Sequence, residues 1–181
     1  MTTHIALIRG INVGRNKRVA MADLRALLAD LGYADVRTLL QSGNAVFSAP
    51  GSAAAVATAV QDAMSEQLKV TARVLVRSPA QLGKAIEADP FGERATEGSK
   101  HFLGFVDRAP AKGTVDAVPQ LAADADTAPD AACFTAGNLY LWCPNGISRS
   151  TLWQVNWDKV LGTAVTLRNW NTVTKLLDLA G

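Results

Sequence analysis

The sequence predicts an α+β fold: two tandem βαββαβ units with antiparallel sheets, a helical connector and a C-terminal helix. Strand-like and helix-like runs alternate in that order, and the order occurs twice. A Gly-Asn pair separates two strand-like runs at corresponding places in each half, at Gly43-Asn44 and Gly137-Asn138. This order is that of a ferredoxin-like sheet, and its repetition indicates an internal duplication.

In the first half, residues 4–9 are an apolar run typical of a buried strand. A helix is predicted over 20–31, where leucines recur at helical spacing and Gly32 can end the helix. Two strands are predicted within 36–48, on either side of Gly43-Asn44. A second helix begins after Ser52 and carries an apolar residue every four positions, and a strand over 70–76 completes the unit.

Ser78 and Pro79 predict the start of a connector helix, because a capping residue precedes a proline in the first turn. In the second half we expect strands at 101–106, 132–136, 139–143 and 164–167, with helices at 112–121 and 151–161. A last helix is predicted over 172–180. We therefore divide the chain into a first unit with its connector (1–88), a linker (89–99) and a second unit with the last helix (100–181), together forming one compact structural domain.

Composition restricts the classes of function. An apolar fraction of 49% and a charged fraction of 19% are those of a globular protein that forms a core. The net charge of +2 means that nucleic-acid binding would need a local basic patch. The sequence has neither a membrane-spanning apolar run nor a signal peptide, so we expect a cytoplasmic protein with reduced cysteines.

A basic loop follows the first predicted strand, with the sequence Arg-Gly-Ile-Asn-Val-Gly-Arg-Asn-Lys-Arg over residues 9–18. It has four basic residues, no acidic residue and two glycines, a composition that suits an anion. The loop matches neither a P-loop nor a dinucleotide-binding pattern. The alternative is a solvated connection in which asparagines serve turns. The candidate ligand-binding residues in this loop are Arg9, Gly10, Asn12, Gly14, Arg15 and Lys17.

Three other polar groups could complete such a site. Hairpin residues usually serve the turn, and polar residues before a helix usually cap it, so each group also has a structural interpretation. As ligand-binding groups they would supply guanidinium and amide hydrogen bonds. The candidate residues are Gln41, Ser42 and Asn44 in the first hairpin, Arg149 before a predicted helix, and Arg168, Asn169 and Asn171 before the last helix.

The segments Arg9-Gly-Ile-Asn-Val-Gly14, Gln41-Ser-Gly-Asn44 and Arg168-Asn-Trp-Asn-Thr-Val173 resemble the bacterial family called domain of unknown function 1697. The resemblance runs nearly end to end, with the three motifs in the family's order. It implies a two-unit α+β fold of ferredoxin-like repeats and no established activity. Family members often carry a second glycine where this chain has Arg15, so its loop is more cationic.

We expect a protein that binds a phosphate-bearing or other anionic ligand, either a nucleotide or a nucleic acid, in a basic cleft lined by arginine and asparagine. One alternative is a metal-independent hydrolase of phosphate esters or acyl phosphates, and another is a protein–protein interaction module. The sequence has no nucleophile elbow, zinc-binding motif or cysteine beside a base, which argues against an enzyme. We assign no catalytic residue, metal ligand or cofactor, and the oligomeric state stays open.

Overall fold

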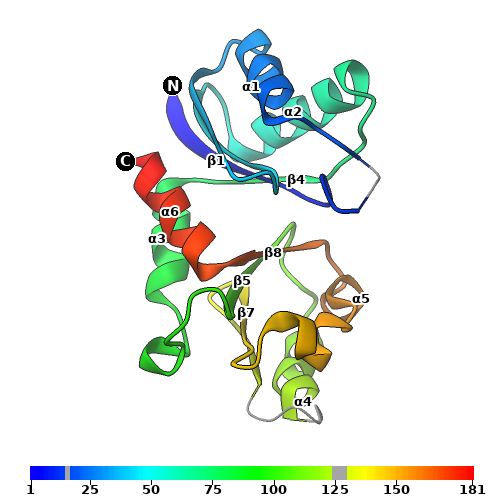
Figure 1. The fold of residues 1–181 in the computed structure, drawn as a ribbon, viewed down its shortest axis with the longest axis vertical. Coiled ribbons are helices and arrows are strands. Elements are labelled where there is room, and N and C mark those ends of the chain that lie inside the picture. The colour runs from blue at the N-terminus through cyan, green and yellow to red at the C-terminus, as the bar shows by residue number, and fades with distance from the viewer. Residues whose placement is uncertain (15–16, 124–129) are drawn as a thin grey trace. The chain divides into compact units, whose positions relative to one another are not determined.

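A computed structural model describes residues 1–14, 17–123 and 130–181 and shows an α+β chain with two four-stranded antiparallel sheets (Figure 1). The chain divides into two compact units, residues 1–83 with 175–181, and residues 84–174. The divisions fall inside α3 (Pro79–Glu87) and α6 (Trp170–Ala180). The segment 89–99, predicted as a linker, lies within the second unit and includes a 3₁₀ turn at Gly92–Arg94.

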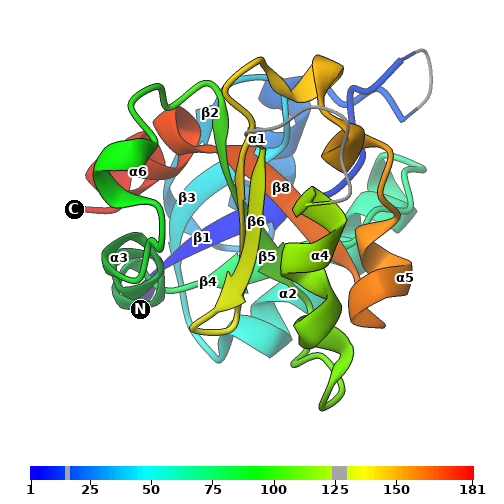
Figure 2. The same cartoon turned by 90° about the horizontal axis from the view of Figure 1, so that it is seen from below.

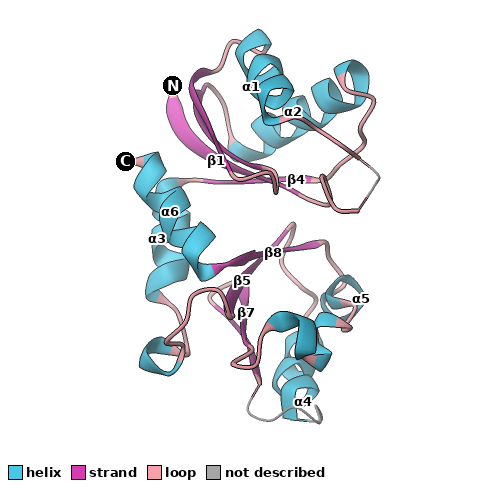
Figure 3. Cartoon of the chain, in the orientation of Figure 1, coloured by secondary structure: helices cyan, strands magenta, loops and turns pink. Residues whose placement is uncertain are grey.

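The first unit has the element order β1 (Thr2–Ile8), α1 (Met21–Asp30), β2 (Ala34–Leu39), β3 (Asn44–Ala49), α2 (Ala53–Gln67) and β4 (Val74–Arg77). Its strands lie in the order β2-β3-β1-β4. Both helices cover the same face of this sheet (Figure 3). The hydrophobic core lies between the helices and the sheet. In it, strand residues such as Ala6 and Phe47 pack with helix residues such as Leu24 and Val60.

Local signals explain the two helices that cover this sheet. The four buried residues of α1 recur at helical spacing, which gives the helix one apolar face. Ser52 caps α2 by accepting a hydrogen bond from the Ala55 amide at 3.2 Å. The end of α1 is followed by Gly32 at φ +78°, the left-handed conformation expected after a helix.

The second unit has the element order β5 (His101–Val106), α4 (Val118–Ala123), β6 (Ala131–Thr135), β7 (Asn138–Trp142), α5 (Trp157–Leu161) and β8 (Val165–Asn169). Its strand order, β6-β7-β5-β8, is that of the first sheet when strands are counted within each unit. Figure 2 shows α4 and α5 beside this sheet. Leu139 and Leu141 of β7 pack in one core with Leu152 and Leu161.

The two hairpin turns lie earlier in the chain than the Gly-Asn pairs suggest. Asn44 is already the first residue of β3 and pairs with Leu39, and Asn138 pairs with Thr135. The second turn consists of Ala136 and Gly137, both at positive φ (47° and 74°). Two consecutive positive φ values are those of a type I′ turn, whose backbone twist matches the twist of the flanking strands. The asparagine that follows each turn is then the first residue of the next strand.

The single helix predicted over 151–161 is wrong. The structure has a 3₁₀ turn at Thr151–Trp153, and α5 begins only at Trp157. Asn156 starts this new helix by accepting a hydrogen bond from the Lys159 amide at 3.1 Å. Trp153 is therefore 61% exposed, whereas Trp157 is buried and donates its indole N–H to the Leu152 carbonyl.

Candidate anion-binding site

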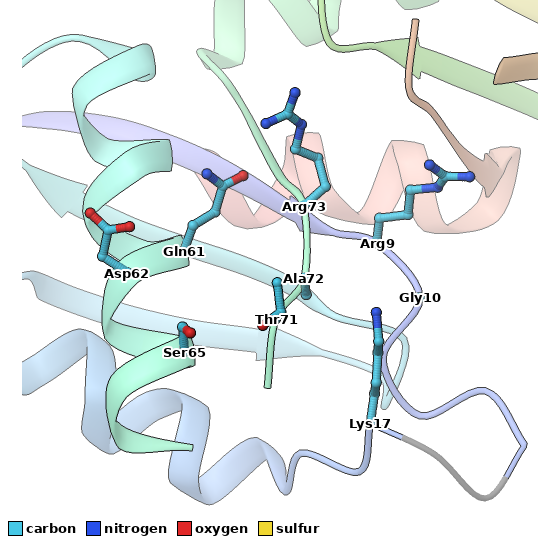
Figure 4. A pocket seen from close by; sticks show the side chains of 9 residues that line it. All are labelled: Arg9, Gly10, Lys17, Gln61, Asp62, Ser65, Thr71, Ala72 and Arg73. Carbon is cyan, nitrogen blue, oxygen red and sulfur yellow. The ribbon is translucent and has the colours of Figure 1, made fainter. Parts of the chain in front are cut away.

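A hollow of about 730 Å³ lies in the first unit, where the loop after β1 meets α2 and the segment that leads into β4 (Figure 4). The loop contributes Arg9, Gly10 and Lys17. Three of the predicted ligand-binding residues therefore line one concave surface. None of the lining residues belongs to α1, the helix that follows the loop.

The hollow contains a pair of arginines that the sequence analysis did not connect. In the antiparallel pairing of β1 and β4, Ile8 lies opposite Val74, so the next pair is Arg9 and Arg73. The Arg9 amide donates to the Arg73 carbonyl at 2.8 Å, which holds the two backbones together. Positive charge is therefore concentrated at this end of the two strands.

The Lys17 ammonium belongs to the same basic surface. In Figure 4 the side chains of Arg9, Arg73 and Lys17 extend toward the same side. Lys17 has φ +52°, and its carbonyl accepts a hydrogen bond from the Asn12 amide at 3.0 Å. The loop is thus closed on itself between these two residues, and this closure places the lysine beside Gly10.

Asn12 holds the loop in shape and does not line the hollow. Its side-chain NH₂ donates to the carbonyls of Val19 (2.8 Å) and Gln41 (2.7 Å), and its Oδ1 accepts from the Val19 amide at 2.9 Å. Its φ of +57° is one that asparagine tolerates better than most residues. Both N–H groups of the side-chain amide are bound to backbone carbonyls, so Asn12 stabilises the conformation of the loop.

Of the other predicted residues of the first unit, those that the structure describes lie outside the hollow. Gly14 is exposed at φ +64°, and Arg15 falls outside the residues that the structure describes. Asn44 is fully buried and donates to the Leu39 carbonyl at 3.1 Å and to the Ser42 hydroxyl at 2.9 Å. Gln41 supplies the carbonyl bound by Asn12. The hairpin residues thus shape the turn beside the loop.

The predicted residues near the C-terminus lie in the second unit. Arg168 donates to the Leu167 carbonyl at 2.9 Å, and burial lowers the pKa of its guanidinium to about 10, so it stays charged at neutral pH. Asn169 caps α6 by accepting from the Thr172 amide at 2.9 Å. Asn171 is exposed, and a Cβ added at Gly98 would overlap its side-chain amide. Arg149 is exposed in a 3₁₀ turn.

The other lining residues were not predicted from the sequence: Gln61, Asp62 and Ser65 of α2, and Thr71, Ala72 and Arg73 before β4. Residues 70–76 were predicted as one strand, whereas β4 begins at Val74. The sequence feature that could have indicated a later start of the strand was the polar stretch Thr71-Ala-Arg73 within residues 70–76. Only the strand register places it opposite Arg9.

Three aromatic rings surround the buried side chain of His101 in the second unit. The His101 ring stacks on Trp170 at 4.1 Å between centroids and contacts Phe91 and Trp142 edge-on. Its Nε2 lies 3.2 Å from the Asp89 carboxylate without hydrogen-bond geometry. Burial therefore outweighs Asp89, and the pKa of His101 is lowered from its ordinary value of 6.5.

This histidine should make stability pH-dependent. A lowered pKa in the folded state means that the unfolded chain binds the proton more tightly below about pH 6.5. We expect the free energy of unfolding to fall as the pH drops through this value toward the lower folded pKa, and to be unaffected by His101 above it. Urea unfolding from about pH 5 to about pH 8 measures the effect.

Asp89→Asn provides the control for this pH dependence. It removes the only influence that raises the His101 pKa, so the loss of stability on acidification should become larger. NMR titration of the His101 ring would report the folded-state pKa directly. A folded pKa above 6.5 in the unmodified protein would contradict the prediction.

Among the residues that the structure describes, no cluster of three or more His, Cys, Asp or Glu side chains is placed to hold a metal ion. In the same part of the chain, no helix has the length and apolar character needed to cross a membrane.

Comparisons with known proteins concern family and fold. Residues 1–140 match a family described as "Protein of unknown function (DUF1697)". This range includes the basic loop and the first hairpin but ends before Arg168. No curated protein matches the chain. The solved structure of conserved bacterial protein SP0830 from Streptococcus pneumoniae is similar over 99% of each chain, with 20% identity and a TM-score of 0.74.

Proposed function

The chain belongs to the DUF1697 family, a family of unknown function, and we propose that it binds a phosphate-bearing or other anionic ligand in the hollow of its first unit. The observation that carries this proposal is the pairing of Arg9 with Arg73 beside Lys17 on one concave surface. Guanidinium groups hold phosphate oxygens by charge-assisted hydrogen bonds.

The second unit indicates that the fold itself does not require two arginines at this place. There Val106 lies opposite Val165, and the Asp107 amide donates to the Ala164 carbonyl at 3.0 Å. This is the same register and the same backbone hydrogen bond as at Arg9 and Arg73. An Asp and an Ala occupy the corresponding pair, so the strand register alone does not dictate two arginines at this place.

Removing either arginine tests the proposal. We expect Arg9→Ala and Arg73→Ala each to weaken binding of pyrophosphate by roughly 10- to 100-fold, because a hydrogen bond to a charged group contributes about 1.5–3 kcal/mol. Isothermal titration calorimetry at low salt measures the affinity. The matched control is Arg37→Ala, an exposed arginine on β2 of the same unit that does not line the hollow.

If pyrophosphate and other phosphate compounds fail to bind the unmodified protein, the proposal is wrong. A complex with another protein, formed without any phosphate-induced rise in Tm, would then favour an interaction module. Phosphate release from acetyl phosphate that is lost in Arg9→Ala would favour the hydrolase alternative.

Two neighbouring residues offer a finer comparison. Lys17 lines the hollow, whereas the adjacent Arg18 is exposed and does not. We expect Lys17→Asn to weaken pyrophosphate binding by about 3- to 10-fold and Arg18→Asn to change it by less than about 2-fold, because exposed charges outside contact distance are screened. Asparagine is chosen because it tolerates the positive φ of Lys17. Equal effects of the two substitutions would indicate a diffuse charge effect instead of a site.

We further propose that the two units are ferredoxin-like repeats that arose by duplication. Equal strand order supports this, as does a shared corner where the last strand of each unit meets a helix. Arg77 and Arg168 each donate to the preceding carbonyl at 2.9 Å, and the next residues, Ser78 and Asn169, each cap the helix that follows. In this interpretation Arg168 and Asn169 stabilise the junction between β8 and α6. We place the protein in the cytoplasm, in keeping with its free Cys133 and Cys143.

A further inference from the structure

The hollow of the first unit is basic on one side only. Arg9, Arg73 and Lys17 supply its positive charge, whereas α2 contributes Asp62 and Ser65. These two α2 residues are three positions apart and so share a face of the helix. In Figure 4 the hydroxyl of Ser65 points toward that of Thr71 across the hollow. The hollow thus has a cationic side and an α2 side that carries one carboxylate and one hydroxyl.

The two sides suit different parts of one ligand. A carboxylate accepts hydrogen bonds from hydroxyl groups and repels phosphate, whereas hydroxyl side chains both donate and accept. A phosphate monoester brings one phosphate group to the cationic side. A nucleic-acid strand would bring further phosphates, and one of them would approach Asp62. Recognition of a strand usually depends on a continuous basic groove with aromatic stacking.

The dimensions of the hollow also fit a small ligand. A volume of about 730 Å³ lies within the range of small-molecule sites. Part of the wall between the two sides is fixed, because the Gln61 side-chain oxygen accepts a hydrogen bond from the Val74 amide at 2.9 Å. The cationic side and the α2 side are thereby held at a set separation.

We infer that the ligand is a phosphate monoester with a hydroxyl-bearing body, such as a sugar phosphate or a nucleoside monophosphate. Its phosphate binds at Arg9 and Arg73, and its hydroxyl groups bind at Asp62 and Ser65. This inference rests on the proposed anion binding at the same hollow. It goes further by excluding a nucleic-acid strand and by assigning the α2 residues a role in specificity.

Calorimetric titrations with inorganic phosphate, ribose 5-phosphate, AMP and a single-stranded oligonucleotide test the inference. We expect ribose 5-phosphate and AMP to bind at least about tenfold more tightly than inorganic phosphate, since each added hydrogen bond to a charged group is worth about tenfold or more. The relative affinity of the two esters distinguishes a sugar phosphate from a nucleotide as the preferred source of the monoester. The oligonucleotide should bind more weakly than either.

Asp62→Asn should change the two affinities in opposite directions. It should weaken ribose 5-phosphate binding by about 3- to 10-fold, because a charge-assisted bond becomes a neutral one, and strengthen inorganic phosphate binding, because a repulsive charge is removed. Ser65→Ala should weaken only the ester. The matched control is Glu66→Gln, which changes the charge of the same helix outside the hollow and should alter neither affinity.

The outcomes separate the inference from the proposed function. If inorganic phosphate binds through Arg9 and Arg73 but ribose 5-phosphate and AMP bind no more tightly, the inference is overturned and anion binding stands. If the oligonucleotide binds most tightly, with affinity that falls steeply with salt, a nucleic-acid site replaces it. If none of the probes binds, both the inference and the proposed function are wrong.

Discussion

Replacing Gly43 by alanine is expected to lower the free energy of unfolding by about 2–4 kcal/mol. Gly43 has φ +79°, a backbone conformation that costs an L-residue roughly 1–2 kcal/mol. A Cβ at this position would also lie 2.9 Å from the Ile8 carbonyl oxygen and 3.0 Å from two carbons of the Ile11 side chain. Because Gly43 accepts a hydrogen bond from the Ile8 amide at 2.7 Å, its backbone cannot simply move away. Equilibrium urea unfolding measures the loss.

Gly137→Ala separates the two causes. Gly137 lies in the corresponding hairpin at φ +74°, and among the described residues, its two chain neighbours apart, no atom lies within 4 Å of a Cβ added there. Its substitution should therefore show only the backbone cost of roughly 1–2 kcal/mol. Gly83→Ala, in the interior of α3 with open space around it, should stabilise the protein by about 0.5–1 kcal/mol. If Gly43→Ala costs no more than Gly137→Ala, close packing against Ile8 and Ile11 does not constrain the turn.

Replacing Asn12 by alanine is expected to cost about 2–4 kcal/mol of stability and to weaken pyrophosphate binding as well. The substitution removes all three side-chain hydrogen bonds and leaves the carbonyls of Val19 and Gln41 and the Val19 amide without this partner. Each such loss contributes about 1 kcal/mol on average. Binding should weaken because the loop that carries Lys17 loses the side-chain hydrogen bonds that hold Asn12 to Val19 and Gln41. Urea unfolding and calorimetry measure the two effects.

Variants at the same position identify the origin of the Asn12 effect. Asn12→Gly also removes the side-chain hydrogen bonds, but glycine adopts the positive φ without strain. Asn12→Gly should therefore be more stable than Asn12→Ala by roughly 1 kcal/mol, which is the backbone cost of alanine at this φ. Asn12→Asp keeps the acceptor for the Val19 amide but loses both donors. Hydrogen exchange at the Val19 amide should accelerate in Asn12→Ala and Asn12→Gly more than in Asn12→Asp. Unchanged stability in Asn12→Ala would show that the loop is held by other contacts.

The placement of most elements could be predicted because it depends on local patterns. The leucine spacing in α1, the serine cap of α2 and the Ser78-Pro79 start of α3 each act within one or two turns of the chain. The predicted helix boundaries were wrong where one local pattern is compatible with two arrangements of the chain. Residues 151–161 have helical spacing throughout, yet the cap at Asn156 starts a new helix and leaves Trp153 exposed.

The candidate site combines features that consecutive residues determine with features that only the tertiary structure determines. The sequence by itself determined that a basic, glycine-containing loop follows the first strand, because charge and backbone freedom are properties of consecutive residues. Only the tertiary structure decided that Arg73 lies opposite Arg9, that α2 contributes Asp62, and that Asn12 binds the Gln41 carbonyl. These relations depend on strand register and helix packing, which join residues far apart in the chain and leave no periodic trace in the sequence.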